Sequence, residues 1–316
     1  MPYKLGVLVI HGMGSQEADF VTPMEVELKR RVGALGGDPD EICFCPAWWA
    51  PVLRERQTDL LRRMQHENEL DWMKMRRFVV HALADAIAYQ DTADRAVTER
   101  IASTSPLAAA SQIAAAGPGA AAGQINVYQQ VHVEIGKAMA TLRQHIRDSA
   151  GDDAPEAPLV VIAHSLGCHM ISNYIWDVRD SPEANPPENP FVGFRTLTSI
   201  VMMGCNIPLF TLAYTNLQPI RFPTPGLSPY FPAGTPAEAI VRVSKWLNFY
   251  DPDDVLGYPL RSLGDTFRER VSEDVAVNAG GPLSTWNPLS HNQYWTDDDV
   301  TRPVARLLHG ILELLR

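Results

Sequence analysis

The chain has 316 residues, of which 46% are hydrophobic and 20% are charged, and its formal net charge is −10. This length and composition predict a globular chain with a large core in one domain. The negative charge disfavours binding to nucleic acid and to anionic membranes, and no apolar run reaches the roughly 20 residues of a membrane span. The N-terminus reads as a core strand rather than a signal peptide, so we expect a cytoplasmic protein.

The N-terminal part alternates strand and helix signals. Residues 4–10 and 42–45 are apolar runs that predict two strands. Between them, residues 22–25 read Thr-Pro-Met-Glu, which predicts a helix start with Thr22 as its cap and Glu25 closing a capping box. A strand, a helix and a second strand in this order predict the beginning of a doubly wound parallel sheet.

The alternation stops after this region. Residues 52–90 have a helical pattern, and we expect its apolar stripe to pack into the core. The residues of that stripe are Trp72, Met75, Val79, Leu83 and Ile87. Residues 101–123 are rich in Ala, Gly, Ser and Pro, which predicts a mobile segment or a loose helical cap. We therefore expect a single domain over residues 1–316 with a helical cap inserted at about residues 52–123.

Strand and helix signals resume in the second half. A helix is predicted at residues 126–147 and a closing amphipathic helix at residues 303–315. Further strands are predicted at residues 159–162, 197–203, 241–250 and 275–278. Together with the first two strands they predict an α/β fold whose sheet is mainly parallel and has about six strands.

One short motif carries candidate chemistry. Residues 159–167 read Leu-Val-Val-Ile-Ala-His-Ser-Leu-Gly, a buried strand that breaks into a helix. A turn this tight strains the corner residue, so Ala163 and Gly167 must be small while Ser165 presents its hydroxyl at the apex. The new helix also directs its free N–H groups toward whatever binds beside the serine. An ordinary strand-to-helix turn is the alternative interpretation of this motif.

A serine nucleophile needs a base, and the base needs a carboxylate to orient it. In a doubly wound sheet these groups come from loops after the carboxyl ends of strands. His291 lies after the last predicted strand. Asp254 follows the strand before it and is the preferred acid, while Asp251 stays open as an alternative and Asp253 is expected to be a turn residue.

The order Ser165, Asp254, His291 together with His11-Gly12-Met13-Gly14 after the first strand resembles the α/β-hydrolase superfamily, particularly its lipase- and esterase-like members. The resemblance covers residues 4–50, 126–208 and 241–316, and the one departure from the motif is alanine in place of its first glycine. It implies an α/β-hydrolase fold with a helical cap.

The resemblance also implies roles for the residues beside the serine. The backbone N–H groups of Met13 and Leu166 would form an oxyanion hole, and His11 and Gly12 would support the loop. Neither a metal nor a cofactor is implied.

The implied function is a serine hydrolase that cleaves a small-molecule or lipid-like carboxylic ester through an acyl-enzyme intermediate. The helical insertion and the aromatic loop at residues 210–236 would favour a hydrophobic acyl group. The alternatives are a thioesterase or an amidase with the same triad, and a non-catalytic binding protein with a hydrolase fold. The sequence specifies neither the natural substrate nor the oligomeric state.

Overall fold

The protein forms a single sheet with helices on both faces. The computed structural model describes residues 2–14, 16–67, 71–89, 126–151, 153–213, 218–280 and 288–316. The strands in these ranges are β1 (Leu5–Ile10), β2 (Ile42–Ala47), β3 (Leu159–His164), β4 (Leu197–Met203), β5 (Trp246–Tyr250) and β6 (Glu273–Ala276). They pair in the order β2-β1-β3-β4-β5-β6, and every pairing is parallel. The predicted mainly parallel sheet of about six strands is confirmed.

The helices connect the strands and flank them. Within the described ranges they are α1 (Thr22–Ala34), α2 (Pro51–Glu67), α3 (Met73–Phe78), α4 (Ala84–Ala88), α7 (Val127–Ala150), α8 (Leu166–Ile175), α9 (Ile207–Phe210), α10 (Ala237–Val243), α11 (Asp265–Arg270) and α12 (Asp298–Leu314). Two π-helical segments, Val79–Leu83 and Trp176–Asp180, interrupt the helical runs, and Pro288–Trp295 forms a 3-10 segment. None of the helices in the described part of the chain has the length and apolar composition that crossing a bilayer requires.

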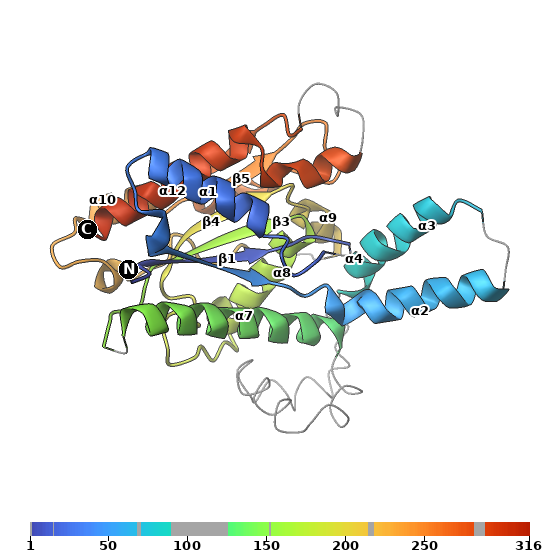
Figure 1. The fold of residues 1–316 in the computed structure, drawn as a ribbon, viewed down its shortest axis with the longest axis horizontal. Helices are drawn as coiled ribbons and strands as arrows, with labels where there is room; N and C mark the ends of the chain where they lie inside the picture. Colours follow the sequence, from blue (N-terminus) through green and yellow to red (C-terminus); the bar gives the residue numbers. More distant parts are fainter. Residues whose placement is uncertain are drawn as a thin grey trace.

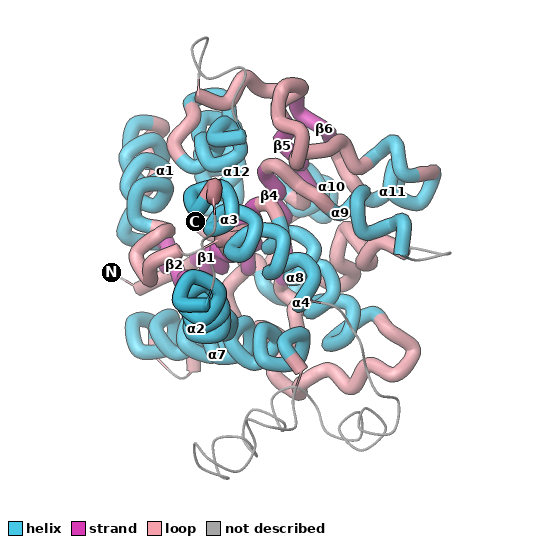
Figure 2. The backbone as a smooth tube through the Cα atoms, turned by 90° about the vertical axis from the view of Figure 1, so that its right-hand side faces the viewer, coloured by secondary structure: helices cyan, strands magenta, loops and turns pink. Residues whose placement is uncertain are grey.

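Both faces of the sheet are buried. Figure 1 shows α1 and α12 over one face and α7 over the other, and Figure 2 shows the same layers from the side. Because side chains alternate along a strand, Leu8 and Ile10 of β1 pack toward α7 and α8, whereas Val7 and Val9 pack toward α1 and α12. A strand that is buried on both faces is mostly apolar, which explains the apolar runs that predict β1 and β3.

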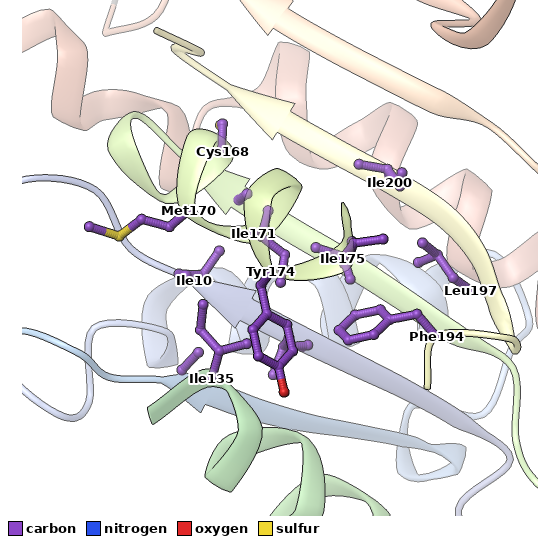
Figure 3. Packing of buried hydrophobic residues seen from close by; sticks show 14 of the residues in the cluster. Ile10, Ile135, Cys168, Met170, Ile171, Tyr174, Ile175, Phe194, Leu197 and Ile200 are labelled. Atoms are coloured by element: carbon purple, nitrogen blue, oxygen red, sulfur yellow. The ribbon is translucent and has the colours of Figure 1, made fainter. Parts of the chain in front are cut away.

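Helix α8 packs against the sheet and against α7, which lies on the same face. Figure 3 shows Ile171, Tyr174 and Ile175 of α8 pointing into the apolar cluster that includes Ile135 of α7. Tyr174 passes so close to α7 that a Cβ on Gly136 would lie 3.0 Å from its hydroxyl oxygen. This packing fixes α8, and with it the turn from β3 that precedes α8.

The apolar stripe predicted to be buried at residues 52–90 is exposed in the structure. Trp72 lies between α2 and α3 with 75% of its surface exposed, and Ile87 is 68% exposed. Val79 and Leu83 are exposed as well, so the predicted core stripe is wrong at the positions whose side chains are described. The face that α4 buries carries Asp85, which is polar and therefore invisible to a search for apolar periodicity. Figure 1 shows α2 and α3 extending away from the sheet.

Several predicted boundaries also need correction. Residues 241–243 belong to α10 and not to β5, because the chain enters a helix after Pro236 before it reaches the sheet. The last strand lies two residues earlier than predicted, and α12 begins at Asp298 rather than at residue 303. The capping box of α1 is absent: the N-cap is Val21, and no side chain caps this helix.

Two apolar segments were expected to form a cap. The prediction for residues 101–123 falls outside the described residues. In the aromatic loop, Phe222 and Phe231 are buried in the two apolar clusters of the core, and Phe222 contacts Trp246 of β5. These two side chains therefore stabilise the sheet and do not cover it as a cap.

Candidate active site

Ser165 occupies a strained corner between β3 and α8. Its backbone has φ 54° and ψ −126°, a conformation that residues other than glycine rarely adopt. The Ser165 N–H donates to the Met203 carbonyl at 2.9 Å, which ties the corner to the end of the neighbouring strand β4. The side chain is fully buried and does not cap α8. This is the geometry that the Ala-His-Ser-Leu-Gly motif predicts.

Two glycines let the backbone approach this corner. A Cβ on Gly12 would lie 2.5 Å from the Ser165 Cβ, and a Cβ on Gly167 would lie 2.5 Å from the His11 carbonyl oxygen. Gly167 therefore has to be small because the end of β1 passes beside it. The prediction that residue 167 must be small is confirmed, but the close contact is with the end of β1 and not only between β3 and α8.

The structure brings His291 and Asp254 together with Ser165. The Ser165 Oγ lies 2.6 Å from His291 Nε2, and His291 Nδ1 lies 2.7 Å from Asp254 Oδ2. Because the carboxylate can only accept a hydrogen bond, it holds the proton of a neutral His291 on Nδ1. The Nε2 lone pair then faces the serine hydroxyl, which can donate to it. All three side chains are buried, although they come from three separate segments of the chain.

The Asp254 carboxylate is held in its ionised form. Burial by itself raises its pKa, but hydrogen bonds from His291, the Leu256 N–H and the Tyr294 hydroxyl outweigh burial and lower the pKa below its usual value. Tyr294 Oη donates to Asp254 Oδ2 at 2.8 Å and lies in the same 3-10 segment as His291. Tyr294 is not among the predicted site residues, although a position three residues after His291 brings the two side chains near one another in a tight helix.

Asp251, the alternative acid, has a different set of contacts. Its Oδ1 accepts from the Asp253 N–H and its Oδ2 accepts from the Ala279 N–H, each at 2.8 Å. The Asp251 N–H donates to the Tyr294 hydroxyl oxygen at 2.9 Å. Asp251 therefore links the ends of β5 and β6 and supports Tyr294, while Asp254 is the carboxylate that reaches the histidine.

Two further glycines make room for this pair. A Cβ on Gly257 would lie 2.6 Å from Asp254 Oδ2, and a Cβ on Gly204 would lie 3.0 Å from the His291 Cε1. Gly204 also has φ 53°, which favours glycine. The sequence gives no signal for the contact between Gly204 and His291, which are distant along the chain, whereas Asp254 and Gly257 lie three residues apart in one turn.

Hydrogen bonds and ring contacts hold the loop after β1 in place. His11 donates from Nδ1 to the Gly12 carbonyl at 2.8 Å, and Trp49 donates from Nε1 to the His11 carbonyl at 3.0 Å. The His11 ring stacks on Trp49 with centroids 4.8 Å apart and meets the edge of Phe20. Burial lowers the pKa of His11 to about 4, so its ring is neutral at neutral pH. These contacts match the bracing position that the resemblance implies for His11.

Two backbone N–H groups beside the serine are unused. Within the described part of the chain, neither the Met13 N–H nor the Leu166 N–H has a hydrogen-bond acceptor. Leu166 begins α8, where an N–H has no partner in its own helix. Two such donors near a serine can stabilise negative charge that develops on a substrate oxygen.

His164 fixes the backbone of the histidine segment. Its Nε2 donates to the His291 carbonyl at 2.5 Å, and the two rings have centroids 4.8 Å apart. Burial lowers the pKa of His164 to about 3, so the ring stays neutral and keeps this hydrogen bond over a wide pH range. His164 therefore contacts the backbone of His291 and makes no hydrogen bond to Ser165.

The parallel sheet with helices on both sides is compatible with an α/β-hydrolase-like fold. No protein-family model matches this sequence, and no curated protein matches it either. Any functional assignment therefore depends on the geometry of Ser165, His291 and Asp254 and on the loops that hold them.

Proposed function

We propose that this protein is a serine hydrolase that cleaves carboxylic esters. The observation that carries the proposal is the continuous hydrogen-bonded series Ser165, His291, Asp254, with distances of 2.6 Å and 2.7 Å and with the serine at a strained corner. A serine hydroxyl is a weak nucleophile, and a neutral histidine oriented by a buried carboxylate is the arrangement that activates it.

The first half of the proposed reaction forms an acyl-enzyme. His291 Nε2 takes the hydroxyl proton while Ser165 Oγ attacks the ester carbonyl carbon, and the carbonyl oxygen becomes negative. The N–H groups of Leu166 and Met13 stabilise this oxygen. The tetrahedral intermediate then breaks its bond to the alcohol oxygen, which receives the proton from His291 and leaves as the alcohol.

Water completes the second half. His291 Nε2 removes a proton from water as the water oxygen attacks the acyl carbon, and a second tetrahedral intermediate forms. When its bond to Ser165 breaks, His291 returns the proton to Oγ and the carboxylic acid leaves. Asp254 stays ionised throughout and stabilises the positive charge that His291 carries in each step.

Exposed apolar side chains support a hydrophobic substrate. Leu209 and Leu212 follow β4, Val255 follows Asp254, and their exposed fractions are 42%, 90% and 69%. Residues that follow the carboxyl ends of parallel strands lie at the edge of the sheet where ligands bind. Ser165 has no exposed surface, so the substrate must displace the groups that cover it.

Hydrolysis of an aryl ester series by the wild-type protein and by Ser165→Ala tests the proposal. We expect the substitution to lower kcat/KM by at least about 10³-fold with no loss of folded protein. Activity that survives in Ser165→Ala would contradict the assignment. A rate that rises from acetyl to longer acyl chains would support the hydrophobic substrate, and a flat series would exclude it.

The same residues could cleave a thioester or an amide. Matched ester, thioester and amide substrates with one acyl group would rank the three by kcat/KM, and we expect the ester to be cleaved faster than the amide. A folded wild-type protein that cleaves none of them would favour the non-catalytic binding protein instead.

A further inference from the structure

The helical segment at residues 51–89 inserts one buried carboxylate into the body of the protein. Asp85 of α4 has 2% of its surface exposed and forms no ion pair with any described Lys or Arg. Its Oδ2 accepts from the Gly14 N–H at 2.8 Å, across 71 residues of sequence, and its Oδ1 accepts from Gln57 Nε2 at 2.5 Å. Burying a charge without a cation is costly, so this contact needs an explanation beyond stability.

Gln57 fixes the carboxylate from the other side. Its Nε2 also contacts the Val80 carbonyl at 3.2 Å, and its Oε1 lies 2.9 Å from His81 Nδ1. These contacts define which way the Gln57 amide faces, so its N–H group points at Asp85. Gln57 of α2, which is itself held by the π-helical segment before α4, thus bonds one carboxylate oxygen of Asp85 and leaves the other for Gly14.

The contact reaches the peptide unit next to the proposed oxyanion donor. The Met13 N–H shares a rigid, planar peptide unit with the Gly12 carbonyl, which accepts from His11 Nδ1. The Gly14 N–H shares the following peptide unit with the Met13 carbonyl, and that unit is held by Asp85. Two consecutive peptide planes are therefore fixed, one on each side of the Met13 Cα, and together they determine where the Met13 N–H points.

We propose that Asp85 is a positioning residue for the reaction at Ser165: it holds the Gly14 N–H so that the Met13 N–H faces the position of the substrate oxyanion. The proposal rests on the proposed function, because it assigns the Met13 N–H to an oxyanion hole. It gives the helical segment at residues 51–89 a part in the reaction through the backbone of a loop that belongs to the sheet.

Three variants separate positioning from mere support of the fold. Asp85→Ala removes both acceptors, whereas Asp85→Asn keeps an oxygen that can accept from Gly14 and loses only the acceptor of the Gln57 hydrogen bond. Tyr89→Phe removes the 2.9 Å hydrogen bond between Tyr89 and His132, a buried contact one turn further along the same segment. It is the control for a loss of buried hydrogen bonding that leaves residues 11–14 untouched.

Hydrolysis of one aryl ester gives the first readout, with rates normalised to the folded fraction. For Asp85→Ala we expect kcat to fall by at least about 10-fold with KM within about 3-fold of wild type, since a misplaced donor weakens transition-state binding and not ground-state binding. Asp85→Asn should lower kcat less than Asp85→Ala does, because it keeps the acceptor for Gly14 while it loses the hydrogen bond from Gln57, and Tyr89→Phe should keep kcat within about 3-fold of wild type. A kcat for Asp85→Ala equal to that of Tyr89→Phe would overturn the proposal.

Amide hydrogen exchange of residues 11–14 gives a second readout that does not need turnover. The Gly14 amide, which donates to Asp85, should exchange faster in Asp85→Ala than in the wild type, while its exchange in Asp85→Asn and Tyr89→Phe should stay close to that of the wild type. Unchanged exchange in Asp85→Ala would overturn the proposal. The two proposals can fail separately. If the wild-type protein hydrolyses no ester and Asp85→Ala still exchanges faster, the proposed function fails while Asp85 still anchors the loop.

Discussion

The carboxyl edge of the sheet and the helical segment at residues 51–89 bury polar groups in different ways. At the edge, Ser165, His291 and Asp254 lie on loops after parallel strands, and the rigid sheet sets their separation. In the helical segment, Gln57 and Asp85 are buried and hydrogen-bonded to each other, while Val79, Leu83 and Ile87 are exposed. Apolar strand patterns in the sequence therefore predict the sheet that positions the site. The helical segment shows that a buried helix face can be polar, and such a face has no apolar pattern to predict it.

The largest effect should separate the two acids at the edge. Asp254→Asn leaves His291 without its carboxylate, and we expect kcat to fall by roughly 10³- to 10⁴-fold. Asp251→Asn should keep kcat within about 10-fold and lower the thermal midpoint, because Asp251 contacts backbone N–H groups and not His291. Assays of both variants side by side measure the difference, and a greater loss of rate in Asp251→Asn would reverse the assignment.

Acid should lower the free energy of unfolding, because several histidine rings are buried. Burial lowers the pKa of His11 and His169 to about 4, and that of His132 and His164 to about 3. The unfolded chain protonates these rings near pH 6.5, so their contribution to the free energy of unfolding is complete above that pH and is lost as the pH falls. Each ring contributes up to about 1.4 kcal/mol per pH unit. Urea titrations from pH 8 to pH 4.5 should show the decrease.

Asp85 should raise the free energy of unfolding as the pH falls, which is opposite to the effect of the histidines. Burial raises its pKa to about 6, so the folded chain takes up that proton before the unfolded chain does, and stability is gained as the pH falls through 6. Replacing a buried ring by His169→Gln should reduce the slope of the unfolding free energy against pH by about one proton. A stability that is flat between pH 6.5 and pH 4.5 would contradict the burial of these histidines.

A glycine at the edge should have a smaller effect that is specific to activity. In Gly257→Ala the new Cβ would lie 2.6 Å from Asp254 Oδ2, so the carboxylate must move away from His291. We expect kcat to fall by about 10- to 100-fold. Gly33→Ala in α1 is the matched control, because nothing lies within 4 Å of its Cβ and alanine favours a helix by about 0.5–1 kcal/mol. Equal kcat values for the two variants would exclude a tight fit around Asp254.

The smallest effect should come from the outward stripe of the helical segment. Ile87→Ala, at a side chain that is 68% exposed, should change the free energy of unfolding by less than about 0.5 kcal/mol. Ile135→Ala, in the fully buried cluster beneath α8, should cost about 2–5 kcal/mol. Denaturant titration compares the two, and a large cost for Ile87→Ala would restore the predicted core stripe.

Sequence patterns predicted the sheet better than they predicted the boundaries of its elements. The strand at residues 197–203 was predicted correctly, because all seven of its residues are buried and five of them are apolar, as in a strand that is covered on both faces. The start of β5 was missed, since Val241 and Val243 have strand-like side chains but lie in a helix that begins after Pro236. Local preference cannot decide between the two when packing on other elements determines the outcome.

The candidate site also contains residues that the sequence predicts and residues that it does not. Ser165, His291 and Asp254 could be predicted because the topology of a parallel sheet orders its loops along one edge. Tyr294, Gly204 and Asp85 could not be singled out, because their parts in the site depend on contacts across the fold. No apolar period or short motif indicates such contacts in one sequence.

The most direct test is the reaction of the folded protein with a fluorophosphonate, followed by intact mass measurement and peptide mapping. A fluorophosphonate reacts with a serine whose proton is removed by a neighbouring base, and it places its phosphorus where the tetrahedral carbon would be. We predict one adduct per chain, located on Ser165, and no adduct in Ser165→Ala. A folded wild-type protein that gains no adduct, or gains it at another residue, would contradict the central claim that Ser165 is an activated nucleophile.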